Sequence, residues 1–237
     1  MLDAVRDLIL GGTCLGCGRA GRLLCESCRD GLDVVPAPAW PSPIPPGLVS
    51  PWAATSYDGT VRDLVIGHKE HRLLTLARPL GALLAITVAA VVRDLALLPA
   101  PIVLVPVPSR PSTVRQRGHE PTTALTRVAA ARLRQGCGLE TICLPLLRTR
   151  PGLADQAGLD AAARSANLAG ALRCHPPALR RLARAGRAVH VIVCDDVLTT
   201  GATAAEAQRA LCAVGLAPLA VAAVAATRRR LPPARGQ

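Results

Sequence analysis

The chain has 237 residues with a formal net charge of +12 at pH 7, so it can bury one substantial core plus a small appendage, and its charge favours polyanionic partners. It has two tryptophans, one tyrosine and no phenylalanine, so it lacks the aromatic platforms on which single-stranded bases usually stack. The N-terminus, MLDAVRDLIL, does not resemble a signal peptide, and the longest apolar run, 79–92, is too short to span a bilayer, so we predict a cytoplasmic protein without membrane insertion.

Two pairs of cysteines near the N-terminus have the spacing of a zinc site. Each pair has a Cys-x2-Cys pattern, and two such pairs complete a tetrahedral site with no position left open for catalysis. Chance cysteines and a redox pair are the alternatives, although a redox pair would be expected to follow a strand. The sequence therefore predicts a module over residues 1–35 in which structural Zn²⁺ is bound by Cys14, Cys17, Cys25 and Cys28.

A proline-rich segment follows the predicted zinc module. Residues 36–51 contain seven prolines. Because proline fixes φ and has no N–H to donate, we expect a stiff linker that neither pairs in a sheet nor forms a helix. We place the domain boundary here, with a main domain over residues 52–227 and a basic tail over residues 228–237.

The main domain is predicted to alternate strands and helices. We expect strands at 52–57, 101–108, 141–147 and 219–226, a mainly helical segment at 60–98 with a break at Pro79, and a helix at 121–135. A loop-rich insertion is expected at 148–172 and a strand–loop–helix unit at 188–213. Alternation of this kind predicts an α/β fold with a mainly parallel sheet flanked by helices.

The strand–loop–helix unit is the most informative segment of the chain. An apolar run from Val189 to Val193 predicts a buried strand, and Asp195 and Asp196 follow at its carboxyl end, where open α/β sheets bind ligands. The two acids can accept hydrogen bonds from hydroxyls or contact a hydrated cation. A loop of small residues and the start of a helix can bind a phosphate. This loop consists of Thr199, Thr200, Gly201, Ala202 and Thr203. The unit therefore predicts a sugar-phosphate site.

A P-loop ATPase and an ordinary capped helix are the two alternatives for this unit. An apolar strand ending in Asp-Asp also occurs in P-loop ATPases, but the chain has no GxxxxGK[ST] segment to bind the phosphates. An ordinary N-capped helix would explain one threonine, but not two acids followed by TTGAT. Both alternatives therefore fit the residues less well than a sugar-phosphate site does.

The segment CDDVLTTGAT resembles the PRPP-binding motif of type I phosphoribosyltransferases. The resemblance implies that fold, with Asp195 and Asp196 contacting the ribose hydroxyls and the 199–203 loop surrounding the 5-phosphate. The order of motifs is similar to that of the ComF family, which are phosphoribosyltransferase-like proteins associated with natural competence and DNA uptake. The motifs are the four-cysteine module, YDGTVRDLVIGHKEH, VPVPSRPSTVRQRGHE, a Gln-x7-Arg-x2-Asn segment and the Asp-Asp loop.

The same resemblance suggests roles for residues outside the Asp-Asp loop. It places the pyrophosphate of PRPP at the loop after the 101–108 strand. The candidate contacts there are Ser109, Arg110, Arg115, Arg117 and the single lysine, Lys69. Solvated basic side chains are the alternative for the arginines, and an ordinary surface charge is the alternative for Lys69. The family usually continues RGFNQ where this chain has RGHEP, which changes the contact to an acceptor or partner.

A mobile flap is the third element that the resemblance implies. Phosphoribosyltransferases use such a segment to exclude water from the reacting ribose. The candidate residues, Gln156, Arg164 and Asn167, lie in the polar insertion, and an ordinary surface loop is the alternative.

Two functions remain open at this point. The first is a PRPP-binding phosphoribosyltransferase of the ComF type that uses Mg²⁺ and transfers the phosphoribosyl group to an unknown acceptor. The second is a non-catalytic PRPP-sensing adaptor in which the zinc module and the basic surface bind single-stranded DNA or a helicase-like protein of the competence machinery.

Overall fold

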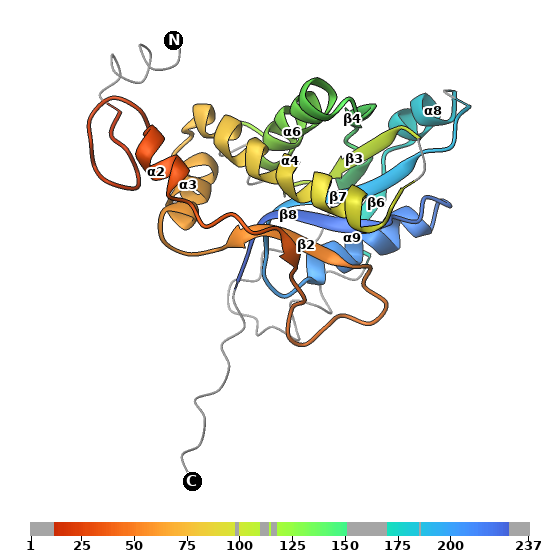
Figure 1. Cartoon of the computed structure of the whole chain (residues 1–237). Helices are drawn as coiled ribbons and strands as arrows, with labels where there is room; N and C mark the ends of the chain where they lie inside the picture. The colour runs from red at the N-terminus through yellow and green to blue at the C-terminus, as the bar shows by residue number, and fades with distance from the viewer. Residues whose placement is uncertain are drawn as a thin grey trace.

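The computed structural model describes residues 12–97, 100–109, 114, 118–150, 170–184 and 186–227. Over these residues the core is a six-stranded sheet in the order β1-β2-β8-β7-β3-β4 (Figure 1). The strands are β1 Ala37–Pro38, β2 Pro51–Ser56, β3 Ile102–Pro106, β4 Thr141–Cys143, β7 His190–Leu198 and β8 Ala220–Ala226. All neighbouring pairs from β2 to β4 are parallel, and only β1 is antiparallel. The predicted α/β fold with a mainly parallel sheet is confirmed.

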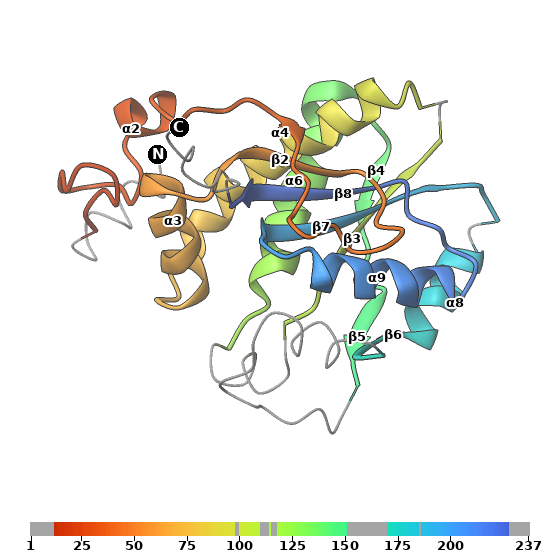
Figure 2. The ribbon, with the colours of Figure 1, turned by 90° about the horizontal axis from the view of Figure 1, so that it is seen from below.

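Helices cover both faces of this sheet. Helices α4 (Ala77–Asp94) and α6 (Pro121–Cys137) lie on one face, and α9 (Ala202–Cys212) lies on the other (Figures 1 and 2). Strands β3 and β8 are buried almost throughout, which agrees with their continuous apolar sequences IVLVP and AVAAVAA. Thr87 of α4 donates a hydrogen bond to Ala223 O of β8 at 2.9 Å, so the helix lies close against the small side chains of that strand.

Helix α4 is longer than the apolar run that the sequence suggested, and the break expected at Pro79 was wrong. Pro79 lies in the first turn of α4, where a proline removes no hydrogen bond of the helix. Together with the 3-10 turn Leu74–Leu76, α4 forms a 21-residue helical stretch that is long and apolar enough to cross a membrane, with a mean hydropathy of 1.9 over an 18-residue window. However, 61% of its most apolar window is buried inside the protein. Burial against the sheet and α6 accounts for this composition, as in the core helix of a globular fold.

A second sheet differs from the prediction of one strand at 141–147. Strand β4 ends at Cys143, and β5 (Leu147–Thr149) begins beyond Pro145 and pairs antiparallel with β6 (Leu172–Cys174). Because proline cannot donate to a strand ladder, the chain leaves the main sheet here. The two strands flank residues 151–169, which lie outside the described part of the chain, and α8 (Pro176–Arg184) follows β6.

The N-terminal module packs beside helix α3 (Gly59–Lys69) and contains the short helix α2 (Glu26–Asp30) (Figure 1).

In the proline-rich segment, the expectation that no residue pairs in a sheet was wrong. Ala37 and Pro38 form β1 and pair with Ala53 and Trp52. A proline is tolerated there because β1 is an edge strand.

The rest of the proline-rich segment, residues 39–50, is called the proline strap below. It lies along α9 on the outside of the sheet (Figure 2). The side chain of Gln208 on α9 donates to Gly47 O at 2.7 Å and accepts from Val49 N at 2.9 Å. Leu48 is buried in the same core cluster as the inner face of α9. The strap is thus packed onto the main domain.

Candidate functional site

The four N-terminal cysteines form one cluster. Their sulfur atoms all lie within 4.8 Å of one another, and the Cys17 and Cys25 Sγ atoms are 3.7 Å apart. Sulfurs arranged tetrahedrally around zinc at about 2.3 Å would be about 3.8 Å apart, so the donor set and its geometry fit a structural zinc site. A Cβ on Gly16 would lie 2.9 Å from Cys28 Sγ, so the turn needs a glycine at this close approach.

The acidic pair lies near the carboxyl end of β7. The sequence suggested that the two aspartates follow the end of this strand. The strand instead continues to Leu198, so the aspartates are its sixth and seventh residues. The neighbouring strand β3 stops at Pro106, which is paired with Cys194, so β7 extends beyond β3 at this point. The two aspartates therefore lie on the part of β7 that has no strand partner on its β3 side.

Backbone amides and one lysine hold the two carboxylates. Asp195 Oδ1 accepts from Asp196 N at 2.8 Å, and Asp196 Oδ1 accepts from Val197 N at 2.7 Å. Lys69 Nζ lies 2.7 Å from Asp196 Oδ2, and the Asp196 side chain is only 4% exposed. The single lysine of the chain therefore neutralises a buried carboxylate.

The second carboxyl of the pair is in a different electrostatic position. Burial and the adjacent Asp196 carboxylate raise the pKa of Asp195 to about 8, although Lys69 opposes this shift. Two close carboxylates in a poorly solvated place favour one shared proton. At neutral pH the pair therefore holds a proton, and a bound cation would favour its release.

The loop after β7 leads directly into α9. Thr199 and Thr200 are exposed, and Gly201 has a φ of 72°, in the left-handed region that favours glycine. A Cβ at Gly201 would also lie 2.9 Å from Pro41 Cγ, so the proline strap covers this loop closely. Ala202 begins α9, and its N–H donates to Thr200 Oγ1 at 3.4 Å. The exposed hydroxyls and the positive end of the helix dipole suit an anion.

Three consecutive residues at the end of α3 contact three different parts of the protein. At Gly67, an added Cβ would lie 3.1 Å from Leu15 Cδ1 of the zinc module. His68 is buried, and its Nε2 lies 3.4 Å from Pro121 O at the start of α6. Lys69 reaches Asp196. The last turn of α3 therefore connects the cysteine cluster with the acidic pair, and residues 67–69 are called the α3 junction below.

Sequence reasoning missed three residues near this site. The sequence assigned no role to His68, which is 1% exposed on α3. Its spacing from Val61 and Leu64, which are buried on the same helix, could have placed it on the inner face. His119 and Glu120 were also missed. His119 Nε2 contacts His68 O at 3.1 Å, and Glu120 Oε2 accepts from Ser109 N at 3.2 Å.

The predicted site residues fall into two groups. Lys69, Asp195 and Asp196 are brought together, and residues 199–203 follow β7 and lead into α9. Ser109 follows β3, the neighbour of β7, and its N–H is bonded to Glu120. The other candidates lie outside the described residues: Arg110, Arg115, Arg117, Gln156, Arg164 and Asn167.

No protein-family model matches this chain, and no curated protein matches it. The class that fold and site define is an α/β protein with a mostly parallel sheet, a four-cysteine zinc-type cluster near the N-terminus, and an acidic pair on β7 followed by a short loop that leads into α9.

Proposed function

We propose that the protein binds PRPP on β7 and the loop after it, and that it is a phosphoribosyltransferase-like protein of the ComF type. The observation that supports the proposal is the order of polar groups along the chain from β7 to the start of α9. An acidic pair with a cation beside it is followed, three residues later, by exposed threonines and a left-handed glycine at the start of α9. Acceptors for ribose hydroxyls and donors for a phosphate are therefore a few residues apart.

In this proposal each residue has a physical task. Asp195 and Asp196 accept hydrogen bonds from the two ribose hydroxyls, and Lys69 pairs with Asp196 at 2.7 Å and holds its side chain in place. Thr199, Thr200 and the first amides of α9 bind the 5-phosphate, because the positive end of the helix dipole and the exposed threonine hydroxyls favour an anion there. Ser109 follows β3, which pairs with β7, and is proposed to contact the pyrophosphate.

In a catalytic reaction, the bond between ribose C1 and pyrophosphate breaks, and an acceptor nucleophile forms the new bond at C1. Mg²⁺, when bound with PRPP, would neutralise charge on the departing pyrophosphate. The residues of the chain would contribute positioning and electrostatic stabilisation. The alternative is an adaptor that binds PRPP without turnover, with the zinc module and the net charge of +12 contacting single-stranded DNA or a helicase-like partner.

The binding proposal is tested by calorimetric titration with Mg–PRPP. Asp195→Asn/Asp196→Asn is expected to weaken binding by at least about tenfold, because the double variant loses the negative charge of the pair and amide oxygens accept weaker hydrogen bonds than a carboxylate does. The exposed Asp63 on α3 provides the matched control, and Asp63→Asn should bind as the parent does. The proposal fails if the folded, zinc-loaded parent does not bind Mg–PRPP, or if the double variant binds equally well.

Turnover separates the two versions of the proposal. Release of pyrophosphate during incubation of the parent with Mg–PRPP and a panel of nucleobases and amines would indicate a transferase. PRPP binding without such release, combined with salt-dependent binding of single-stranded DNA, would favour the adaptor.

A further inference from the structure

A groove lies between the zinc module and helices α4 and α6, and it is lined by none of the residues of the proposed PRPP site. Its volume is about 590 Å³, within the range of about 300–1,000 Å³ that is typical of ligand pockets. Its floor consists of aliphatic side chains from both sides, among them Leu24 and Leu32 of the module and Ile86 of α4. Ile86 is 41% exposed, so the floor presents apolar surface to solvent.

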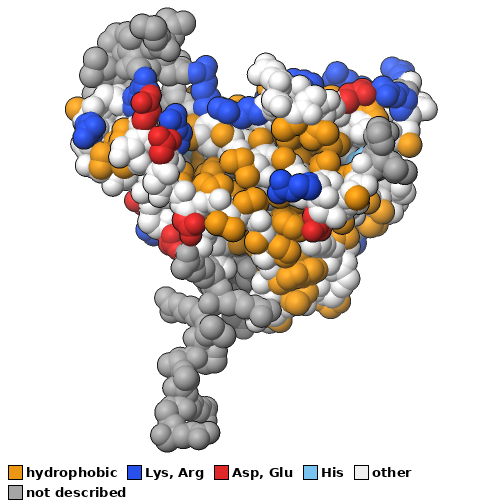
Figure 3. Space-filling view, in the orientation of Figure 1, with side chains coloured by type: hydrophobic (Ala, Val, Ile, Leu, Met, Phe, Trp, Pro, Cys, Tyr) orange, Lys and Arg blue, Asp and Glu red, His pale blue; other side chains and the backbone are white. Residues whose placement is uncertain are grey.

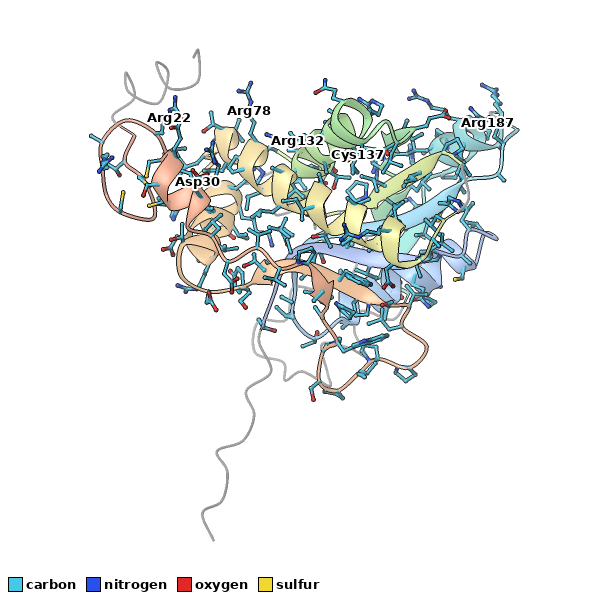
Figure 4. The ribbon with its side chains drawn as sticks, in the orientation of Figure 1. Arg22, Asp30, Arg78, Arg132, Cys137 and Arg187 are labelled. Atoms are coloured by element: carbon cyan, nitrogen blue, oxygen red, sulfur yellow. The ribbon has the colours of Figure 1, made fainter. Side chains whose placement is uncertain are left out.

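Four arginines line the same groove. Arg22 and Arg29 come from the zinc module, Arg78 from α4 and Arg132 from α6. Figure 4 shows Arg22, Arg78 and Arg132 along the upper side of the view, and Figure 3 shows Lys and Arg side chains above an apolar expanse on this face. Over the described part of the chain, no aspartate or glutamate lines the groove. We call it the arginine-rimmed groove.

The arginines of the module can change partners at little cost. Arg22 pairs with Glu26 at 2.9 Å and Arg29 with Asp30 at 3.0 Å, and all four side chains are about half exposed or more. Exposed pairs of this kind contribute only about 0–1 kcal/mol, because water and salt screen them. An incoming carboxylate can therefore replace either intramolecular partner.

The lining also discriminates between two kinds of polyanion. Single-stranded nucleic acid usually needs aromatic side chains for base stacking, and no aromatic residue is among the described residues that line the groove. Aliphatic floors bind the Leu, Ile or Met anchors of amphipathic helices, and arginine rims pair with carboxylates beside those anchors. We propose that the arginine-rimmed groove docks an acidic amphipathic segment of a partner protein.

A peptide-display selection tests this proposal with the full, zinc-loaded chain as bait. The probe is a library of random 16-residue peptides. The expected winners carry aliphatic residues at i, i+3 or i+4 and i+7, with Asp or Glu between them. Synthetic winners are then titrated, alongside versions in which Glu and Asp are replaced by Gln and Asn and a single-stranded oligothymidine.

Matched variants connect binding with the groove. Ile86→Asp in the groove is paired with Ile142→Asp on β4, because the two isoleucines are 41% and 43% exposed. Arg132→Glu in the groove is paired with Arg180→Glu on α8, because both arginines are exposed. Peptide affinity should fall at least about tenfold for Ile86→Asp and Arg132→Glu, a change of about 1.4 kcal/mol, and by less than about twofold for the two controls.

Three outcomes would overturn the proposal. The first is selection of no peptides, or of basic or neutral ones. The second is binding that is equally sensitive to the groove variants and to their controls. The third is oligothymidine binding that depends on Ile86 and Arg132 while peptide binding does not, which would assign the groove to nucleic acid. PRPP titrations should be unchanged in all four variants, so failure here is distinguishable from failure of the PRPP proposal.

Discussion

The contact between Lys69 and Asp196 joins a positive and a negative side chain at 2.7 Å within the proposed site. Asp196 is almost fully buried, whereas Lys69 is 31% exposed, so the pair is neither a surface ion pair nor a fully buried one. A buried carboxylate without its cation is costly, so the lysine has a structural task beside its proposed role in binding.

Replacing Lys69 by methionine should therefore destabilise the protein. We expect a loss of about 1–3 kcal/mol, between the small values of exposed pairs and the roughly 3–5 kcal/mol of broken buried ones. Denaturant unfolding of Lys69→Met, Asp196→Asn and the double variant measures this. The double variant should lose less stability than the sum of the two single losses, because the second substitution removes the orphaned charge. Strict additivity would show that the pair does not interact in solution.

The raised pKa of Asp195 predicts a pH dependence with a definite sign. Its folded pKa of about 8 lies above the ordinary value of 3.8, so the folded state binds this proton more tightly than the unfolded state. The associated stabilisation is full below about pH 4 and is lost as pH rises through about 8. Unfolding free energies of the parent, measured relative to Asp195→Asn, should therefore fall over this window. A difference that is independent of pH would refute the shift.

At the scale of elements, two contacts hold the site's surroundings in place. The proline strap packs against Gly201 and is bound by Gln208 of α9. The α3 junction connects the zinc module with β7. Both contacts join segments that the sequence alone predicted to be a separate module and a linker.

The strap contact is tested by comparing two glycines. Gly201 and Gly138 both have positive φ, 72° and 64°, but a Cβ at Gly138 would meet nothing within 4 Å. Gly138→Ala should cost only the backbone term of about 1–2 kcal/mol. Gly201→Ala should cost more, because the new methyl group must displace Pro41. Equal losses in thermal or denaturant unfolding would mean that the strap does not press on the loop.

The α3 junction is tested by removing zinc. Since metal binding and folding of such modules are coupled, a chelator should loosen the module and, through Leu15 and Gly67, the helix it packs on. Amide hydrogen exchange should become faster in α3, while α9, on the opposite face of the sheet, should keep its protection. Unchanged exchange in α3 after verified zinc loss would contradict the connection.

At the scale of the whole molecule, the sequence predicted what depends on local pattern. Continuous apolar runs identified β3, β7 and β8, and cysteine spacing identified the cluster that the structure brings within 4.8 Å. The pairing of β1 was not predictable from proline content, because it depends on which edge of the sheet is vacant. The Lys69–Asp196 contact was not predicted either, since it joins distant positions through the packing of α3.

The central claim, a PRPP site on β7, is tested most directly by a crystal structure of the zinc-loaded protein grown with Mg–PRPP. We expect the ribose hydroxyls against Asp195 and Asp196 and the 5-phosphate within the loop of residues 199–203 at the start of α9. PRPP bound elsewhere, or a 199–203 loop without phosphate at saturating ligand, would contradict this claim.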